Sequence, residues 1–202
     1  MRLWTACKMT LMMTLLTGII YPFVMTGLAQ ALFPYQARGS LITQDGHIVG
    51  SRLIGQNFTS PAYFHGRPSA AGDKGYDADS SGGSNLGPTN KALISEVRQR
   101  LERVLEKNPG VGARQVPIDL VTASASGLDP EISPAAAAIQ IARIAKIRGL
   151  PESAVRKLVL THTRPRWAGI MGEPGVNVLE LNLALDRACA VHAKRQRAVA
   201  GR

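Results

Sequence analysis

The sequence predicts an α+β (or α/β) extracytoplasmic domain on a single N-terminal transmembrane helix. The run from Met9 to Ala37 contains no Asp, Glu, Lys, Arg or His. After it, apolar residues recur at helical spacing in some segments and in short runs bounded by Gly and Pro in others. About 165 residues follow the apolar run, which is enough for one domain with a hydrophobic core.

The transmembrane helix is expected over residues 9–34, because about 20 helical residues cross the hydrocarbon core. Its large aliphatic and aromatic side chains favour insertion by about 2.4 to 5 kcal/mol, and membrane helices tolerate the kink that Pro22 can introduce. A cleaved signal peptide is the alternative, because residues 29–31 (Ala-Gln-Ala) resemble a small-residue cleavage site. The apolar run is nevertheless longer than the usual signal-peptide core of about 7–15 residues, which favours the uncleaved anchor.

The basic residues Arg2 and Lys8 precede the helix and favour a cytoplasmic N-terminus. We therefore expect a cytoplasmic segment at residues 1–8, a soluble extracytoplasmic domain at 35–190 and a basic flexible tail at 191–202. These bounds place the domain on the side of the membrane away from the cytoplasm.

The net charge of +10, from 24 basic and 14 acidic residues, indicates an acidic protein surface or lipid headgroups as partners. Nucleic acid is not an expected partner, because few aromatic residues lie among the basic ones and the domain is exported. Cys7 and Cys189 are not expected to pair, so the fold is not a disulfide scaffold. No metal site is expected, because the histidines are scattered along the chain.

The first part of the soluble domain is predicted to be a hairpin followed by an ordered but irregular segment. Asp45-Gly46 lies between two short apolar runs, as in tight β-hairpins, and residues 51–58 are expected to continue as a strand. Residues 59–90, called here the polar segment, are rich in Gly, Ser, Asp and Pro but contain three aromatic residues. Disordered linkers seldom contain so many aromatics, so we expect this segment to be ordered.

The second part is predicted to be mainly helical. Apolar spacing and capping residues predict helices over residues 90–107, from 133 to 149 and over 151–161. Residues 116–121 are expected to form a buried strand. Residues 176–185 fit two patterns, a strand by alternation and a helix by the Asn177/Glu180 capping pair.

The densest glycine-rich stretch precedes the first of these helices, and it is a candidate loop for contact with a nucleotide or with a partner. Glycines allow close backbone approach, and the N–H groups at a helix N-terminus can hold an anion. Gly82 and Gly87 have P-loop spacing, but Pro88-Thr89 stands where the phosphate-binding Lys-Ser/Thr belongs. The turn-rich alternative, a loop that docks on its own domain or on a partner, is favoured. The loop consists of Ser81, Gly82, Gly83, Ser84, Asn85, Leu86, Gly87, Pro88, Thr89 and Asn90.

A second candidate is a serine hydrolase that uses Ser124 or Ser126 with Asp129 and His162. No G-x-S-x-G elbow surrounds either serine. The alternative is that these hydroxyls satisfy a turn and a helix cap.

Several long strings, in order along the chain, resemble the C-chain family of the Kdp-type potassium-transporting P-type ATPases. The strings are residues 50–56, 63–70, 81–90, 116–124, 127–130, 132–136, 172–174 and 176–179. The resemblance covers nearly the whole chain to about Asp186. The motif positions also singled out are Tyr63, Phe64, His65, Arg67, Ser124, Asp129 and His162.

The resemblance implies a single-pass inner-membrane subunit without a catalytic site of its own. It implies assembly with an ion-conducting, an ATP-hydrolysing and a small accessory subunit. It also implies a role as a catalytic chaperone that raises the affinity of the pump for ATP, a role tied to residues 81–90. No cofactor is expected on the chain itself, and ATP is met only through the complex.

Two positions depart from the family pattern, and one implication conflicts with the predicted topology. Arg164 stands where an acidic residue is usual, and Glu131 where His or Asp is common, which leaves the local polar contacts open. An extracytoplasmic domain would hold residues 81–90 across the membrane from cytosolic ATP. We therefore expect a structural and regulatory role, with the domain docked on the ion-conducting chain.

Overall fold

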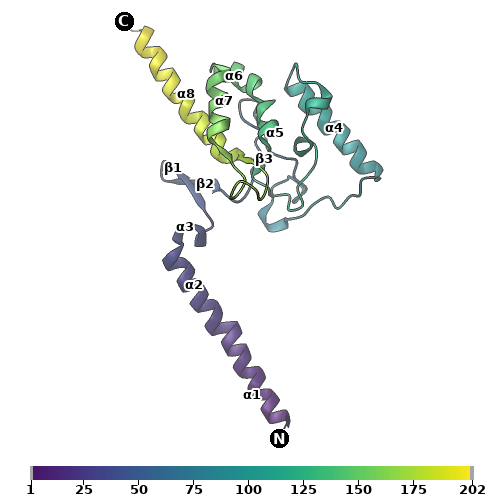
Figure 1. The fold of residues 1–202 in the computed structure, drawn as a ribbon, viewed down its shortest axis with the longest axis vertical. Helices are drawn as coiled ribbons and strands as arrows, with labels where there is room; N and C mark the ends of the chain where they lie inside the picture. Colours follow the sequence, from purple (N-terminus) through teal and green to yellow (C-terminus); the bar gives the residue numbers. More distant parts are fainter. Residues whose placement is uncertain (1, 201–202) are drawn as a thin grey trace. The chain divides into compact units, whose positions relative to one another are not determined.

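The computed structural model describes the backbone of residues 2–200 and the side chains of residues 2–192. The chain divides into two compact units, Met1–Ser51 and Arg52–Arg202. Figure 1 traces both units along the chain.

A helical run from Arg2 to Leu32 makes up most of the first unit. It consists of α1 (Arg2–Leu15), the π-helical turn η1 (Leu16–Ile20) and α2 (Tyr21–Leu32). Among the described residues it is the one helical run long and apolar enough to cross a membrane. The π turn lies just before Pro22, and the Tyr21 N–H donates to the Leu16 carbonyl. Because proline has no N–H to donate, a wider turn at this point accommodates it within the helix.

A short helix and a hairpin complete the first unit. After α3 (Pro34–Ala37), β1 (Leu41–Gln44) pairs antiparallel with β2 (His47–Ser51), which confirms the predicted hairpin. Asp45 and Gly46 both have positive φ, at 51° and 80°, as a two-residue turn of the primed type requires.

The second unit contains a three-stranded antiparallel sheet that was not predicted from the sequence. The central strand β5 (Gly175–Asn177) pairs with β3 (Glu131–Ile132) on one side and β4 (Thr163–Arg164) on the other. The same unit contains these helices next to the sheet in the chain: α5 (Pro134–Ala138), α6 (Ile141–Arg148), α7 (Glu152–Thr161) and α8 (Val178–Ala200). The largest fully buried apolar side chains are those of Phe64, Ile141, Ile144, Val155, Val176, Leu181 and Leu185. This mixture of helix and sheet confirms the predicted α+β class.

The predicted helices are present, with one interruption. Helix α4 (Lys91–Lys107) begins where the Asn90 side chain accepts the Ala92 N–H. The helix predicted from 133 to 149 breaks at Gln140 into α5 and α6, and it ends at Gly149 in the left-handed conformation. The ambiguous region divides at Asn177, which ends β5 and whose side chain accepts the Glu180 N–H at the start of α8.

Two predicted strands are wrong. Residues 116–121 contain the 3-10 turn η4 (Ile118–Leu120), which buries Leu120 but leaves Ile118 exposed. Residues 52–58 are irregular, because their backbone groups bond elsewhere: the Gly55 N–H donates to the Leu128 carbonyl, and the Arg52 carbonyl accepts from Asn177.

The polar segment is irregular apart from the short 3-10 turn η2 (Ala78–Ser80), yet it is well tied to the domain. Phe64 and Ala71 are fully buried, which agrees with the expectation of an ordered segment. A second 3-10 turn, η3 (Ala113–Gln115), follows α4. The segment predicted as a basic tail continues α8 as far as Ala200, and residues 201–202 lie outside the described part of the chain.

Candidate functional site

The polar segment is anchored by a cluster of hydrogen bonds around Arg67, Ser69 and Tyr76. The Arg67 guanidinium pairs with the Asp129 carboxylate at 2.9 Å, and the Ser69 hydroxyl donates to the Gly127 carbonyl at 2.6 Å. The Tyr76 hydroxyl donates to the Arg67 carbonyl at 2.7 Å. Burial and the Asp129 charge raise the pKa of Tyr76 to about 12, so the phenol keeps its proton for this bond. The structure thus brings Arg67 and Asp129, two of the motif positions, together.

Two buried amide side chains hold the backbone of Phe64 and His65. Asn182 accepts the Phe64 N–H at 2.9 Å and donates to the Phe64 carbonyl at 3.0 Å. Gln140 does the same for His65, at 2.8 and 3.2 Å. Each amide supplies one donor and one acceptor, so buried polar groups in an irregular segment are satisfied as in a sheet.

The His65 ring is neutral at physiological pH. Burial lowers its pKa to about 4, a hydrogen bond to the Ser60 carbonyl acts in the opposite direction, and the positive charges of Arg143 and Lys107 lower it further. The structure therefore places this motif position in a positive electrostatic environment.

Arg143 is a buried cation that is bonded to neutral acceptors. Its guanidinium donates to the carbonyls of Pro61 and Tyr63 and to the side chains of Asn108 and Gln140. Burial lowers the pKa of Arg143 to about 10, which leaves it charged. The side chain therefore ties α6 to the polar segment and to the end of α4.

Tyr63 attaches the polar segment to α6 and α8 through contacts with Arg148 and Asp186. Its hydroxyl donates to the Asp186 carboxylate at 3.0 Å, and the Arg148 guanidinium lies 4.4 Å from its ring centroid. Arg148 also pairs with Asp186 at 2.9 Å. The motif positions Tyr63, Phe64 and His65 are thus in structural contacts with the helices.

The glycine-rich loop at 81–90 packs on its own domain at one end and caps a helix at the other. The Gly82 N–H and the Ser81 hydroxyl donate to the Ser126 carbonyl at 2.9 and 3.0 Å. A Cβ on Gly83 would lie 3.0 Å from the Ala125 carbonyl, so this approach is close. Asn90 caps α4. A role for the loop in nucleotide binding stays a prediction.

In the described part of the chain, the histidine of the hydrolase alternative is not hydrogen-bonded to either serine or to the aspartate. Ser124, Ser126 and Asp129 line the same shallow depression, and the Ser124 hydroxyl accepts the Gly127 N–H. The Nδ1 atom of His162 lies 2.9 Å from the Leu158 carbonyl at the end of α7. Among the described residues, no hydrogen bond joins His162 to Ser124, Ser126 or Asp129. The arrangement therefore supplies neither serine with a histidine base.

Comparison with known proteins identifies the family. The model described as "KdpC: K+-transporting ATPase, c chain" matches residues 3–187. The KdpC subunit of the potassium-transporting ATPase of Gemmatimonas aurantiaca is 60% identical over 181 residues, which is 90% of each chain. That of Polaromonas naphthalenivorans is 59% identical over 90% of this chain and 92% of the relative, and that of Acidobacterium capsulatum 58% over 91% and 96%.

This chain belongs to the KdpC family. The resemblance inferred from the sequence is confirmed, and so is its place in a potassium-transporting ATPase. The chain is a membrane-associated subunit of that ATPase with one candidate transmembrane helix at its N-terminus.

Glu131 and Arg164, the two positions expected to depart from the family pattern, contact one another in the structure. They lie on β3 and β4, on either side of the central strand β5, and form a two-point ion pair at 2.7 and 3.0 Å. The hydrogen bond and the charge of Glu131 raise the pKa of Arg164. Each of these side chains therefore has a charged partner, and the sequence could not show this without the strand pairing.

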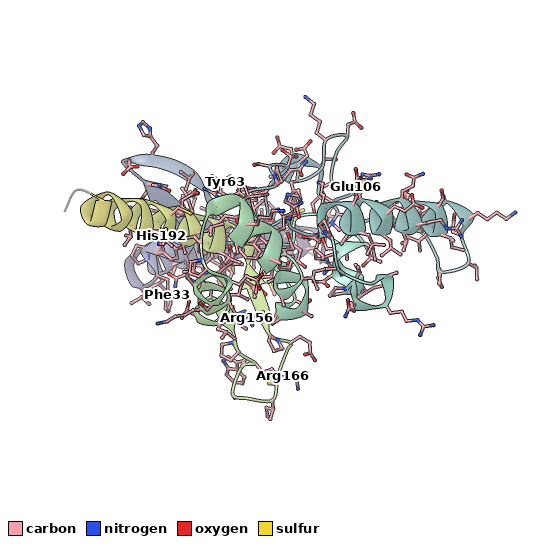
Figure 2. The ribbon with its side chains drawn as sticks, turned by 90° about the horizontal axis from the view of Figure 1, so that it is seen from above. Phe33, Tyr63, Glu106, Arg156, Arg166 and His192 are labelled. Carbon is pink, nitrogen blue, oxygen red and sulfur yellow. The ribbon has the colours of Figure 1, made fainter. Side chains whose placement is uncertain are left out.

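A loop that no sequence pattern predicted projects between β4 and β5. Figure 2 shows the loop that carries Arg166 extending away from the helices. Trp167 and Met171 exchange backbone hydrogen bonds at 2.8 and 3.0 Å, and Arg166 pairs with Glu173. Trp167, Ile170 and Met171 are 71%, 77% and 58% exposed. The sequence feature that could have predicted this loop is the presence of three large apolar residues between Pro165 and Pro174 without helical or strand periodicity.

Among the residues that the structure describes, no group of three or more His, Cys, Asp or Glu side chains is arranged to hold a metal ion.

Proposed function

We propose that this chain is a non-catalytic accessory subunit of a high-affinity, ATP-driven potassium uptake complex, and that it stabilises the assembled complex. The observation that supports this most directly is the exposed apolar loop, defined as residues 165–174. Large apolar side chains gathered on a constrained, exposed loop are typical of protein interaction sites, because their transfer out of water favours association.

The proposed partners are the ion-conducting, ATP-hydrolysing and small accessory subunits, together with membrane lipids around the anchor. The loop docks on the exposed face of the ion-conducting subunit. Nucleic acid is not among the partners. The anchor helix contributes at residues 9–34, where its exposed apolar surface meets lipid or neighbouring membrane helices.

The proposed orientation has residues 1–8 in the cytoplasm, the domain at 35–190 in the periplasm, and the anchor in the inner membrane. The basic residues before the anchor support this orientation. In this arrangement the chaperone effect on ATP affinity is indirect: the subunit favours an assembled state of the pump in which the ATP-hydrolysing subunit binds nucleotide more tightly.

Co-purification of the complete complex from detergent-solubilised membranes tests the assembly role. The double variant Trp167→Ser/Ile170→Ser is expected to lose the other subunits while the chain itself remains folded in the membrane. Leu160→Ser is the matched control, because Leu160 is 68% exposed on α7 outside the loop. Full retention of all subunits by the double variant would contradict the proposed docking loop.

The same preparations test the indirect effect on ATP. In preparations that retain all subunits, the Michaelis constant for ATP is expected to match that of the native complex. In preparations from which the double variant has dissociated, the Michaelis constant for ATP is expected to be higher. An unchanged constant in a complex that lacks the chain would contradict the chaperone role.

A further inference from the structure

A cavity of about 360 Å³ lies between the second half of α4 and the stretch around residues 56–68. Four of its lining residues carry a positive charge, Arg67, Arg100, Arg103 and Lys107, and none of its lining residues is Asp or Glu. Its volume is at the small end of the range of about 300–1,000 Å³ that is usual for small-ligand sites. All of its lining residues belong to the second unit.

Two of the four cations have no carboxylate partner. Arg67 is paired with Asp129 and Arg100 with Glu96, whereas Arg103 and Lys107 form no ion pair among the described residues. Arg103 and Lys107 are four residues apart on α4, where like charges face one another and repel. A bound anion would relieve this repulsion.

Arg67 supplies an independent observation. Its Nε atom is buried without a hydrogen-bond partner, the one such side-chain atom found among the described residues. An unmade hydrogen bond on a buried charged group is costly, and Arg67 lines both this cavity and the shallow depression at residues 124–130, so the unmet donor adds to the demand for an acceptor in this part of the domain. His65 also lines the cavity; burial lowers its pKa to about 4, and the charges of Arg143 and Lys107 lower it further, so the ring adds no charge of its own at neutral pH.

The remaining walls limit the class of ligand. Phe58, Val104 and Leu120 provide apolar surface beside the cations, so the cavity suits an anionic group attached to a short carbon body. Arginine forks and a lysine ammonium together are the usual partners of phosphate oxygens.

We propose that this cavity binds the phosphate group of a small organic phosphate, with Arg103 and Lys107 on the phosphate and the carbon body against Phe58 and Leu120. The phosphate belongs either to a soluble phosphate ester or to the phosphoglycerol headgroup of an anionic lipid. The glycine-rich loop at 81–90 does not line this cavity, so the site is separate from it.

The test is calorimetric titration of the full chain in a neutral detergent at low ionic strength. Glycerol 3-phosphate is the soluble probe, dihexanoyl phosphatidylglycerol below its micelle concentration is the lipid probe, and glycerol is the uncharged control. Saturable binding of the first probe assigns a soluble ester, and binding of the second alone assigns the lipid headgroup. Binding of neither probe, or equal binding of glycerol, overturns the proposal.

Matched charge variants locate the site. Arg103→Gln/Lys107→Gln is expected to weaken binding by about tenfold or more, since each charge-assisted contact contributes substantially. Lys91→Gln/Arg98→Gln removes the same charge from exposed positions of α4 outside the cavity and is expected to leave binding within about twofold.

Thermal unfolding without ligand provides a readout that does not depend on binding. The cavity variant is expected to melt at the same or a higher temperature than the native chain, because removing two like charges relieves repulsion. In the titrations, an equal loss of probe binding in the cavity variant and in the Lys91→Gln/Arg98→Gln control would show non-specific charge attraction and overturn the assigned site.

Discussion

At Gly55 the chain has no room for a side chain. A Cβ there would lie 2.4 Å from the Tyr76 ring and 2.6 Å from the Asp129 carbonyl oxygen. Gly55→Ala is therefore expected to lower the free energy of unfolding by about 1–3 kcal/mol, because the ring and the backbone must both move. Urea denaturation of the full chain measures this change.

Gly87→Ala is the control, because nothing lies within 4 Å of the position of its Cβ. We expect this variant to match the native chain or to exceed it slightly, since alanine restricts the unfolded chain. Equal destabilisation by both variants would contradict the close packing at Gly55.

The neutral His65 ring makes stability depend on pH in a defined direction. Its folded pKa of about 4 lies below the usual histidine pKa of 6.5, so protonation favours the unfolded chain. Stability is fully present above about pH 6.5 and declines as the pH falls toward about 4. Allowing for partial exposure of the ring, the loss at about pH 4.5 is expected to be about 1–2 kcal/mol.

His65→Gln provides the comparison for this pH dependence, because glutamine can still donate to a carbonyl but does not titrate. Denaturation curves at about pH 7 and about pH 4.5 are expected to show a smaller loss in the variant than in the native chain. Parallel losses in both proteins would assign the acid sensitivity to other groups.

At the scale of elements, the outer strands of the small sheet are joined by the Glu131–Arg164 ion pair. Glu131→Arg and Arg164→Glu are each expected to destabilise the domain by about 0.5–1 kcal/mol, and the double reversal is expected to recover most of the loss. A double-mutant cycle in urea measures the coupling. The pair is partly exposed, so the coupling is expected to fall at high salt.

The Arg166–Glu173 pair is the matched control for that cycle. Its side chains are 45% and 80% exposed, compared with 49% and 30% for Arg164 and Glu131. Its coupling is therefore expected to be the smaller of the two. A larger coupling for the loop pair would contradict this ranking.

Helix α4 differs from the other long helix of the domain, α8, in what surrounds it. None of its residues is buried, although its apolar residues recur at helical spacing. The period of the apolar residues predicted the helix, and Asn90 predicted its start. Neither indicated that the apolar face would be only half-covered, because that depends on which segments pack against it.

At the scale of the whole molecule, the orientation of the anchor helix determines on which side of the membrane the domain lies. A reporter that is active only in the periplasm, fused after Arg202, is expected to be active, and a cytoplasm-specific reporter at the same site is expected to be silent. The converse pattern would contradict the orientation. A fusion before Arg2 is the internal control and is expected to behave in the opposite way.

Local features of this protein were determined by the sequence alone. The apolar run, the Asp45-Gly46 turn, the Asn90 cap and the end of a helix at Gly149 each depend on residues within a few positions, so pattern and propensity suffice. The strings that resemble the KdpC family were equally readable, and membership of that family is confirmed.

Tertiary structure decided the rest. Residues 116–121 resemble a strand but form a 3-10 turn, and two-residue strands at 131 and 163 become a sheet only because β5 lies between them. Arg143 is stable in the interior because carbonyls and amides distant in sequence surround it. Such contacts depend on which segments meet in space, and no short stretch of sequence contains that information.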